Sequence, residues 1–409
     1  MRVLYIHQYF NTHREAGGSR SYSLARALIA KGHQVVMLTS NRNNPDLPAV
    51  YSCQIDGIEV VYVKNRYSNK MGFLRRILSF LHFMFMSILV ASRVRNIDLV
   101  FATSTPLTVG IPGIIFKRLY KVPFVFEVRD LWPELAIAMG IIKNRIVINV
   151  TSWLEAKIYQ ESDHIISLAP GITKGIIAKS VPAEKVTMIS NGCDLNLFRA
   201  EVHSQPSNWQ FQEEDLVLVY AGTHGLANGL QWVIEVAKEA KLRRQIRIKF
   251  VLIGDGMTKP DLIRQKEQFE LDNVFFLDPM PKQQLVDYLA AADMGMQLLA
   301  NVPSFYYGTS PNKFFDYLAA GKPVLNNYPG WVADLIRQWQ CGIVVRSDDY
   351  DDFFRQIEPL ITNRQLLKAM GERARNLASA HFRRDELATR FVQTLECTCR
   401  EYQERRTAI

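Results

Sequence analysis

The sequence predicts an α/β protein built from two doubly wound domains. Apolar, β-rich runs alternate with segments of helical spacing along most of its 409 residues, which is typical of parallel sheets covered by helices. That length exceeds what one ordinary hydrophobic core supports. Residues 200–214 show no periodicity, so we interpret them as a linker. We therefore expect an N-terminal domain at 1–199, a C-terminal domain at 200–382, and a charged helix at 383–409 that packs back across the first domain.

Composition argues against several classes of protein. Hydrophobic residues make up 48% of the chain and there is no low-complexity tract, so we expect a globular protein. The five cysteines are scattered without a C-x-x-C pattern, which indicates reduced thiols in the cytosol rather than disulfides or a zinc site. The eight histidines show no metal-ligand spacing, and we expect no metal. Met1 and Arg2 lead directly into an apolar run, so we expect no signal peptide.

The first predicted unit is a strand, a glycine loop, a helix and a second strand. The strands are expected at 2–6 and 35–38, and the helix at 21–30. Gly17 and Gly18 precede the helix, where their backbone can approach a ligand at the helix N-terminus; a tight turn is the alternative. The loop is not a G-x-G-x-x-G pattern and no acid ends the second strand, so a nicotinamide cofactor is not expected.

The next segment, after a predicted strand at 58–63, concentrates much of the net charge of +9. Residues 60–97 hold no acid and seven basic residues, Lys64, Arg66, Lys70, Arg75, Arg76, Arg93 and Arg95. Within them, residues 73–91 predict an apolar helix whose uninterrupted part, about 15 residues, is shorter than the roughly 20 that a spanning helix needs. It is either a core helix or a helix resting on an anionic membrane. We favour the membrane, because burial does not explain the clustered arginines.

Candidate catalytic residues follow a later strand of the same domain. Strands are predicted at 98–103, 123–128, 163–167 and 185–189, and helices at 110–120 and 147–162. Because ligands gather at the carboxyl ends of parallel strands, Arg129 and Asp130 are candidates directly after the strand at 123–128. The alternative for Asp130 is a salt-bridged loop acid.

The C-terminal half repeats the alternation with its own glycine loops. Strands are predicted at 216–220, 248–253, 274–277, 294–298 and 323–326, with helices at 230–240 and 284–291 and a further helix opened by Lys259. Gly222 and Thr223 follow the first of these strands, and Gly254 follows the second. Together these loops outline a pocket that suits a diphosphate.

The helix expected from residue 310 has signals at both ends. Ser310 is the predicted N-cap with a proline after it, and a glycine at 321 is expected to end the helix. Asn312, Lys313 and Asp316 are spaced to share one face near the N-terminus, where free N–H groups and a lysine can hold a phosphate. The alternative is a capped core helix with a solvated Lys–Asp pair.

Taken together, these sequence motifs resemble those of GT-B glycosyltransferases of family 4, which are retaining enzymes that use nucleotide sugars. The resemblance covers essentially the whole length: the glycine pair at 17–18, the segments at 31–35, 191–198 and 254–256, and the run 313–324. The strings 129–134 and 310–313 look most like bacterial enzymes that add sugars, including N-acetylfucosamine, to lipid-linked O-antigen or capsule precursors. The fold it implies is two Rossmann-like domains facing across a cleft.

The resemblance also implies roles for the candidates. The donor diphosphate would lie between Gly17–Gly18 and the helix at 310, with Lys259 and Lys313 neutralising charge and Asp316 on the ribose. Met280, in a loop after a strand, is a plausible contact of the base, most often uracil. The family has a further acid eight residues before Asp316, where this chain has Gly308, and often a histidine where Arg129 stands. Asp130 would then orient the acceptor.

The predicted function is retaining, metal-independent transfer of a sugar from a nucleotide sugar to a polyprenyl-diphosphate-linked glycan. The expected location is the cytoplasmic face of the bacterial plasma membrane, as a peripheral protein without a nucleic-acid partner. Two alternatives are a nucleotide-sugar epimerase of GT-B fold and a non-catalytic, membrane-docked assembly partner. The glycine at 308 and the apolar helix disfavour the epimerase, while Lys259, Lys313 and Asp316 disfavour the non-catalytic partner.

Overall fold

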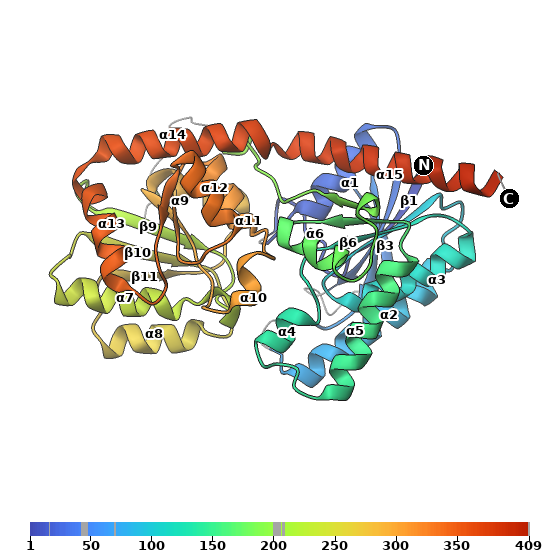
Figure 1. Ribbon diagram of the computed structural model, residues 1–409, viewed down its shortest axis with the longest axis horizontal. Coiled ribbons are helices and arrows are strands. Elements are labelled where there is room, and N and C mark those ends of the chain that lie inside the picture. The colour runs from blue at the N-terminus through green and yellow to red at the C-terminus, as the bar shows by residue number, and fades with distance from the viewer. Residues whose placement is uncertain (16, 42–47, 69–70, 199–205, 207–208, 408–409) are drawn as a thin grey trace.

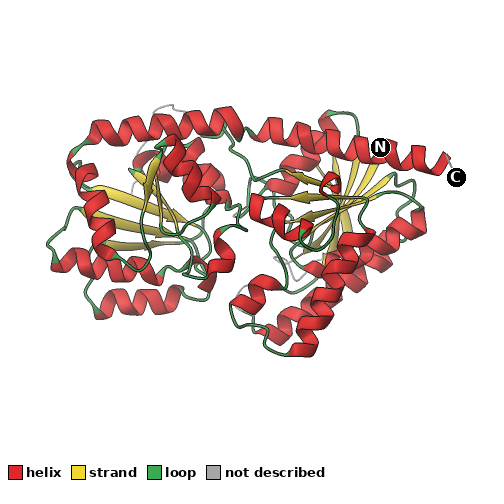
Figure 2. Cartoon of the chain, in the orientation of Figure 1, coloured by secondary structure: helices red, strands yellow, loops and turns green. Residues whose placement is uncertain are grey.

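The computed structural model describes residues 1–15, 17–41, 48–68, 71–198, 206 and 209–407. They form two α/β domains, which two helices at the C-terminal end of the chain connect along one side (Figure 1). Each domain is a sheet between layers of helices (Figure 2). Both the two-domain architecture and the return of the last helix to the first domain agree with the fold predicted from the sequence.

The N-terminal domain contains an eight-stranded sheet in the order β3-β4-β2-β1-β5-β6-β7-β8. All its pairs are parallel except β3–β4. The central strands are buried along their length, as their continuous apolar runs require. The strands are β1 (Arg2–Ile6), β2 (Gln34–Asn41), β3 (Val50–Ile55), β4 (Ile58–Lys64), β5 (Leu99–Thr103), β6 (Phe124–Val128), β7 (His164–Ser167) and β8 (Val186–Met188).

Helices cover both faces of this sheet and build two core clusters. One cluster joins α1 (Arg20–Ala30) to the C-terminal helix α15 (Arg384–Thr407). The other joins the sheet to α2 (Phe73–Ala91), α3 (Gly110–Tyr120), α5 (Arg145–Glu161) and α6 (Pro170–Ile177). The short α4 (Glu134–Ala138) reaches the second domain, where it contacts α10 (Pro303–Tyr306).

The C-terminal domain has a six-stranded parallel sheet in the order β11-β10-β9-β12-β13-β14. Its strands are β9 (Leu216–Ala221), β10 (Ile248–Ile253), β11 (Val274–Leu277), β12 (Met294–Gln297), β13 (Val324–Asn326) and β14 (Gly342–Val344). Its remaining helices are α7 (Gln231–Leu242), α8 (Lys259–Gln268), α9 (Lys282–Ala291), α11 (Asn312–Ala319), α12 (Trp331–Trp339), α13 (Tyr350–Thr362) and α14 (Arg364–His381). The predicted linker, residues 200–214, lies largely outside the described residues.

The start of α11 differs from the prediction. Pro311 takes the cap position with φ −74° and ψ 125°, no side chain caps the helix, and the first helical residue is Asn312. Ser310 is therefore not the N-cap. Its hydroxyl instead accepts a hydrogen bond from the backbone N–H of Asn191 at 3.1 Å. The other end agrees with the sequence, since Gly321 follows the helix with φ +64°.

The predicted apolar helix is α2, and its two sides have different surroundings. Phe83 and Ala91 are fully buried against the sheet. Leu74, Leu78 and Phe85 are 74%, 65% and 57% exposed. Among the described residues, Leu74–Ala91 is the one segment long and apolar enough to cross a membrane, by length and composition alone. The helix is thus part of the core on one side and an exposed apolar surface on the other.

Candidate functional site

Parallel strands bring the predicted site residues to facing edges of the two sheets. In the first domain the register pairs Ile6 with Ala102 and Thr103 with Glu127, so the segments after β1, β5 and β6 emerge together. In the second, Ile253 pairs with both Ala221 and Leu277, so the loops after β9, β10 and β11 emerge together. Both edges are the carboxyl ends of the strands, where ligands of open α/β sheets bind.

Gly18, Arg129 and Asn312 meet where the two domains touch. A Cβ added to Gly18 would lie 3.1 Å from Asn312 Nδ2 and 4.0 Å from a guanidinium nitrogen of Arg129. Gly17 has φ +120°, a conformation that favours glycine. The glycine loop therefore approaches α11 closely, and the guanidinium of Arg129 lies beside both.

Arg129 and Asp130 are fixed by neighbours from the adjacent strands. The backbone N–H of Arg129 donates to Ser104 Oγ at 3.0 Å, and its Nη1 lies 3.3 Å from His7 Nε2. Thr105 Oγ1 donates to Asp130 Oδ2 at 3.3 Å. Burial raises the pKa of the Asp130 carboxyl, and the charge of Arg129 opposes this effect. The Asp130 carboxyl is thus close enough to feel the charge of Arg129, but no ion pair joins the two side chains within the described residues.

Lys313 is held inside the C-terminal domain. Its Nζ donates to Asn228 Oδ1 at 3.1 Å and lies 4.6 Å from the centre of the Tyr220 ring. A Cβ on Gly222 would approach Lys313 Cε to 2.9 Å, so the glycine makes room for this side chain. Burial lowers the pKa of Lys313 to about 8. Among the described residues no carboxylate forms an ion pair with Lys313.

The two glycine loops of this domain touch each other. A Cβ on Gly254 would lie 1.9 Å from the carbonyl oxygen of Gly222, and Gly254 has φ +146°. Lys259 Nζ donates to the carbonyl of Gly254 at 2.9 Å and pairs with Asp278 at 3.0 Å. The neighbouring Thr223 is exposed. Lys259 is thus at the predicted edge, but its ammonium is bound to this loop and to an acid.

Asp316 has a different environment from Lys313. Its Oδ1 lies 2.6 Å from Lys282 Nζ, and Lys282 also lies over the ring of Phe198 at 5.6 Å. The two charged side chains of α11 therefore contact different neighbours instead of meeting at one point. Met280, two residues before Lys282, is half-buried and packs against the core of the C-terminal domain.

Direct hydrogen bonds join the domains beside α11. Asn191 Nδ2 donates to the carbonyl of Ser310, and the backbone N–H of Gly171 donates to the carbonyl of Tyr307 at 3.1 Å. Gly308, where the family pattern has an acid, is buried, and a Cβ there would meet its nearest neighbour at 3.7 Å. There is accordingly room for a Cβ at this position, and Ser310 serves as a bridge between the domains.

Several residues at the site were not singled out from the sequence. Asn228 binds Lys313, Lys282 binds Asp316, and His7 lies against Arg129. A buried ion pair was also not singled out from the sequence: Arg20 Nη2 lies 2.7 Å from Glu127 Oε2. Arg20 begins α1 directly after the glycine loop, so this pair anchors the loop on β6. The available signal was the position directly after β1 for His7, and the start of α9 after Pro281 for Lys282.

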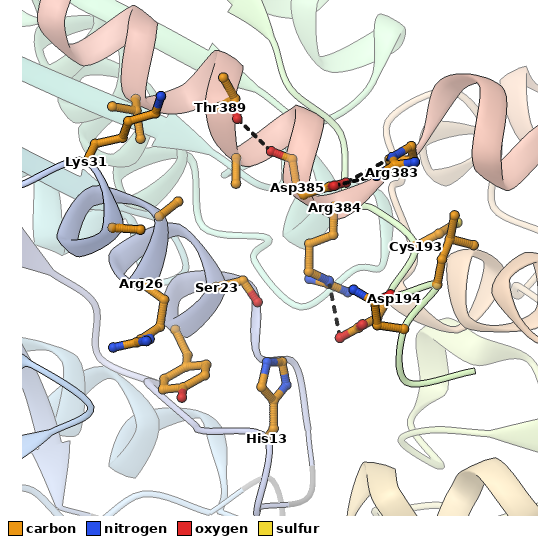
Figure 3. A pocket seen from close by; sticks show the side chains of 17 residues that line it. His13, Ser23, Arg26, Lys31, Cys193, Asp194, Arg383, Arg384, Asp385 and Thr389 are labelled. Atoms are coloured by element: carbon orange, nitrogen blue, oxygen red, sulfur yellow. Dashed lines mark hydrogen bonds and ion pairs between the residues drawn. The ribbon is translucent and has the colours of Figure 1, made fainter. Parts of the chain in front are cut away.

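A separate cavity lies beside the junction of α15 with the first domain (Figure 3). It has a volume of about 620 Å³, and its lining includes His13, Arg26, Asp194 and Arg384. In Figure 3 Arg384 points to Asp194, and the two are 4.0 Å apart. None of the predicted donor-binding residues lines this cavity. Within the described residues, no group of three or more His, Cys, Asp or Glu side chains is placed to hold a metal ion.

Comparison with known proteins identifies both halves of the chain. Residues 16–192 match the glycosyl transferase 4-like domain, and residues 202–377 match glycosyl transferases group 1. A Bacillus subtilis glycosyltransferase named for teichuronic acid biosynthesis, TuaH, is 26% identical over 202 residues, 49% of each chain. N-acetyl-alpha-D-glucosaminyl L-malate synthase of Bacillus anthracis is 20% identical over 57% of this chain and 59% of its own length. The chain thus matches about half the length of these curated relatives.

Solved structures show the same fold over the whole chain. Sucrose-phosphate synthase from Thermosynechococcus elongatus superimposes with a TM-score of 0.75 at 16% identity, covering 100% of both chains. HepE from Anabaena, solved in complex with UDP and glucose, gives 0.68 at 16% identity over 96% of this chain and 99% of its own. The chain therefore has the GT-B fold, and its two halves match a glycosyl transferase 4-like domain and a glycosyl transferases group 1 domain in that order.

Proposed function

We propose that this protein transfers a sugar, with retention of configuration, from a UDP-sugar to a glycan carried on polyprenyl diphosphate. The observation that carries the proposal is Lys313. It is a partly buried lysine, its pKa is lowered by burial, and no described carboxylate pairs with it. A buried ammonium without a counter-ion is unfavourable, and a bound diphosphate would supply the missing negative charge.

The surroundings of Lys313 suit a nucleotide diphosphate. The N-terminus of α11 presents free N–H groups, and the contact of Gly222 with Gly254 brings two backbone loops to the same place. HepE, a protein of the same fold, has been solved with UDP and with UDP-glucose. In the proposed complex Lys313 and α11 bind the diphosphate, Asp316 binds the ribose, and the loop of Met280 contacts the base.

The first domain supplies the acceptor side of the reaction. The acceptor hydroxyl attacks the anomeric carbon on the face from which the diphosphate departs. The new oxygen–carbon bond forms as the carbon–phosphate-oxygen bond breaks, and the departing phosphate oxygen takes the hydroxyl proton. Arg129 lies across from α11 to stabilise the leaving group, and each well-placed donor of this kind contributes about 3 kcal/mol. Asp130 orients the acceptor. Charge neutralisation by Lys313 and Arg129 makes this scheme independent of a metal.

The surface of α2 and one curated relative support the proposed acceptor class and location. The exposed apolar side of α2 lies in a segment whose only charged residues are basic, which suits an anionic lipid surface. TuaH is named for the synthesis of a bacterial cell-surface polymer, teichuronic acid. We propose that the protein acts at the inner face of the bacterial plasma membrane, in surface-polysaccharide synthesis of the O-antigen or capsule type, with an N-acetylated deoxysugar as the donor sugar.

An assay with and without acceptor tests this function. The protein is incubated with UDP-sugars, alone and with a detergent-solubilised polyprenyl-diphosphate sugar. We expect UDP release that depends on the acceptor, and an α-linked product from an α-linked donor. Isomerisation of the nucleotide sugar without acceptor would instead establish the epimerase. Absence of nucleotide binding to any UDP-sugar would contradict both enzymes and leave the non-catalytic assembly partner.

Asp316→Ala tests the ribose assignment separately. If Asp316 binds the ribose hydroxyls, the variant loses affinity for UDP by roughly tenfold, the effect of one or two charge-assisted hydrogen bonds. Asp261→Ala is the matched control, because Asp261 lies in the same domain and its side chain is 62% exposed. Equal UDP affinities of the two variants, measured by calorimetry, would rule out the assignment.

A further inference from the structure

A second helix of the N-terminal domain, α5, exposes large apolar side chains. Ile146, Val150 and Trp153 are 73%, 56% and 65% exposed, and their spacing places them on one side of the helix. Ile141, just before the helix, is 43% exposed. The other side of α5 is packed, since Ile158 is fully buried in the core of the domain. α5 is therefore amphipathic with its apolar stripe pointing outward, the opposite of an ordinary surface helix.

This stripe belongs to the same side of the molecule as the exposed side of α2. The helices α2, α3 and α5 all cover one face of the sheet, so their outer sides form one layer of the surface (Figure 1). Between them α3 adds Leu119, which is 57% exposed. Hydrogen bonds fix the layer, because Tyr120 Oη of α3 donates to the carbonyl of Val94 after α2, and Arg118 Nη2 pairs with Glu161 of α5.

The charges around this surface favour an anionic lipid bilayer over a protein partner that carries charges of both signs. From Leu135 to Tyr159 the only acid is Glu155, which is fully buried and pairs with Lys179. Lys143 and Arg145 are exposed at the N-terminus of α5. Residues 60–97, which include α2, contain no acid at all. Apolar side chains with basic neighbours and an interfacial tryptophan match an anionic bilayer surface.

The helix α5 follows the candidate catalytic residues in the chain. β6 ends directly before Arg129 and Asp130, and α4 and α5 follow them along the chain. Leu135 of α4 packs into a core cluster of the second domain, and α4 contacts α10. Because α5 follows β6 and α4 along the chain, it begins on the side of the sheet where the strands end and where Arg129 and Asp130 lie.

We infer that α5 and α2 together dock the protein on an anionic membrane, with Trp153 in the interface. The inference rests on the proposed function in one respect, since docking here would bring the cleft to a lipid-linked acceptor. The two-helix surface holds the N-terminal domain in a defined orientation, which a single helix cannot do. The surface formed by α2 and α5 binds the bilayer at the boundary between the phospholipid headgroups and the acyl chains.

Flotation with phosphatidylglycerol–phosphatidylcholine vesicles tests the docking surface without any substrate. The variant Val150→Ser/Trp153→Ser should reduce vesicle partitioning by roughly tenfold or more, because it removes two exposed apolar contacts. The control Leu242→Ser/Ile246→Ser removes side chains that are 78% and 71% exposed in the other domain. It should partition like the wild type. Equal flotation of both double variants would overturn the inference.

Quenching of tryptophan fluorescence by brominated lipids gives a second readout. Wild-type emission should be quenched on vesicle binding, and Trp153→Phe should remove most of that quenching while retaining flotation. Quenching that is unchanged in Trp153→Phe would show that α5 does not enter the interface. Wild-type protein that fails to float would also overturn the inference. In that case, acceptor-dependent UDP release with a detergent-solubilised acceptor would still decide the proposed function independently.

Discussion

At the scale of single residues, Lys313 links stability to nucleotide binding. Replacing it with methionine should weaken UDP affinity by roughly tenfold to a hundredfold, because a charge-assisted contact to phosphate is lost. Lys368→Met, at an exposed lysine of α14, is the matched control and should bind UDP normally. Calorimetric titration with UDP measures both. Normal affinity of Lys313→Met would remove Lys313 from the donor site.

The lowered pKa of Lys313 also predicts the direction of two pH effects. Because its folded pKa is about 8 and its unfolded pKa is near 10.4, the unfolded state binds more protons between these values. This group therefore destabilises the unliganded protein below pH 8, by roughly 1–3 kcal/mol, and the effect disappears as pH rises towards 10.4. Lys313→Met should thus unfold at a higher denaturant concentration than wild type at pH 7. A less stable methionine variant would contradict this account.

Individual candidate residues have stronger signals in the sequence than the residues that contact them. Lys313, Arg129 and Gly18 became candidates because helix starts, strand ends and glycine loops have local signatures. Asn228 and Glu127 could not, because the contacts that make them important come from residues 85 and 107 positions away. The separation of Asp316 from Lys313 likewise depends on Lys282, which approaches from a different helix.

At the scale of elements, the contact between the two glycine loops is the most sensitive feature. Gly254→Ala would place a Cβ 1.9 Å from the carbonyl of Gly222 at φ +146°, so the loops must separate. We expect a loss of roughly 1–3 kcal/mol in stability together with weaker UDP binding. Gly308→Ala is the control, because its Cβ has room at 3.7 Å. Denaturant unfolding and UDP titration of both variants check the prediction, and equal behaviour would contradict it.

Elements were predicted where hydrophobic periodicity was strong. The bounds of α2, α3 and β10 agree with the sequence, whereas β3, α4, α6 and α12–α14 were not predicted. β3 had a signal, since Asp56 and Gly57 form a two-residue turn with φ +50° and +84° between it and β4. Ser310 was misassigned as a cap because a local pattern cannot reveal that Asn191, from the other domain, competes for its hydroxyl.

At the scale of the whole molecule, the C-terminal helix α15 forms part of the hydrophobic core of the N-terminal domain. Phe391 is fully buried and packs edge-on against Phe101 of β5 at 5.0 Å between ring centres. Backbone hydrogen bonds also join the start of α15 to the end of the N-terminal domain. The N–H of Cys193 donates to the carbonyl of Phe382, and the N–H of Arg384 donates to the carbonyl of Cys193. The first domain is therefore complete only when residues after 382 have been made.

This arrangement predicts a local effect for a substitution in α15. Phe391→Ala should destabilise the N-terminal domain by about 3–5 kcal/mol, the usual effect of removing a buried phenyl ring. In hydrogen exchange, α1 and β1 should lose protection while β9 and β10 keep theirs, because those strands belong to the other core. Arg400→Ala, at an exposed position of the same helix, should change neither domain. An equal loss of protection in both sheets would mean that the two domains unfold as one cooperative unit, with α15 acting as a link between them and not as a part of the first core.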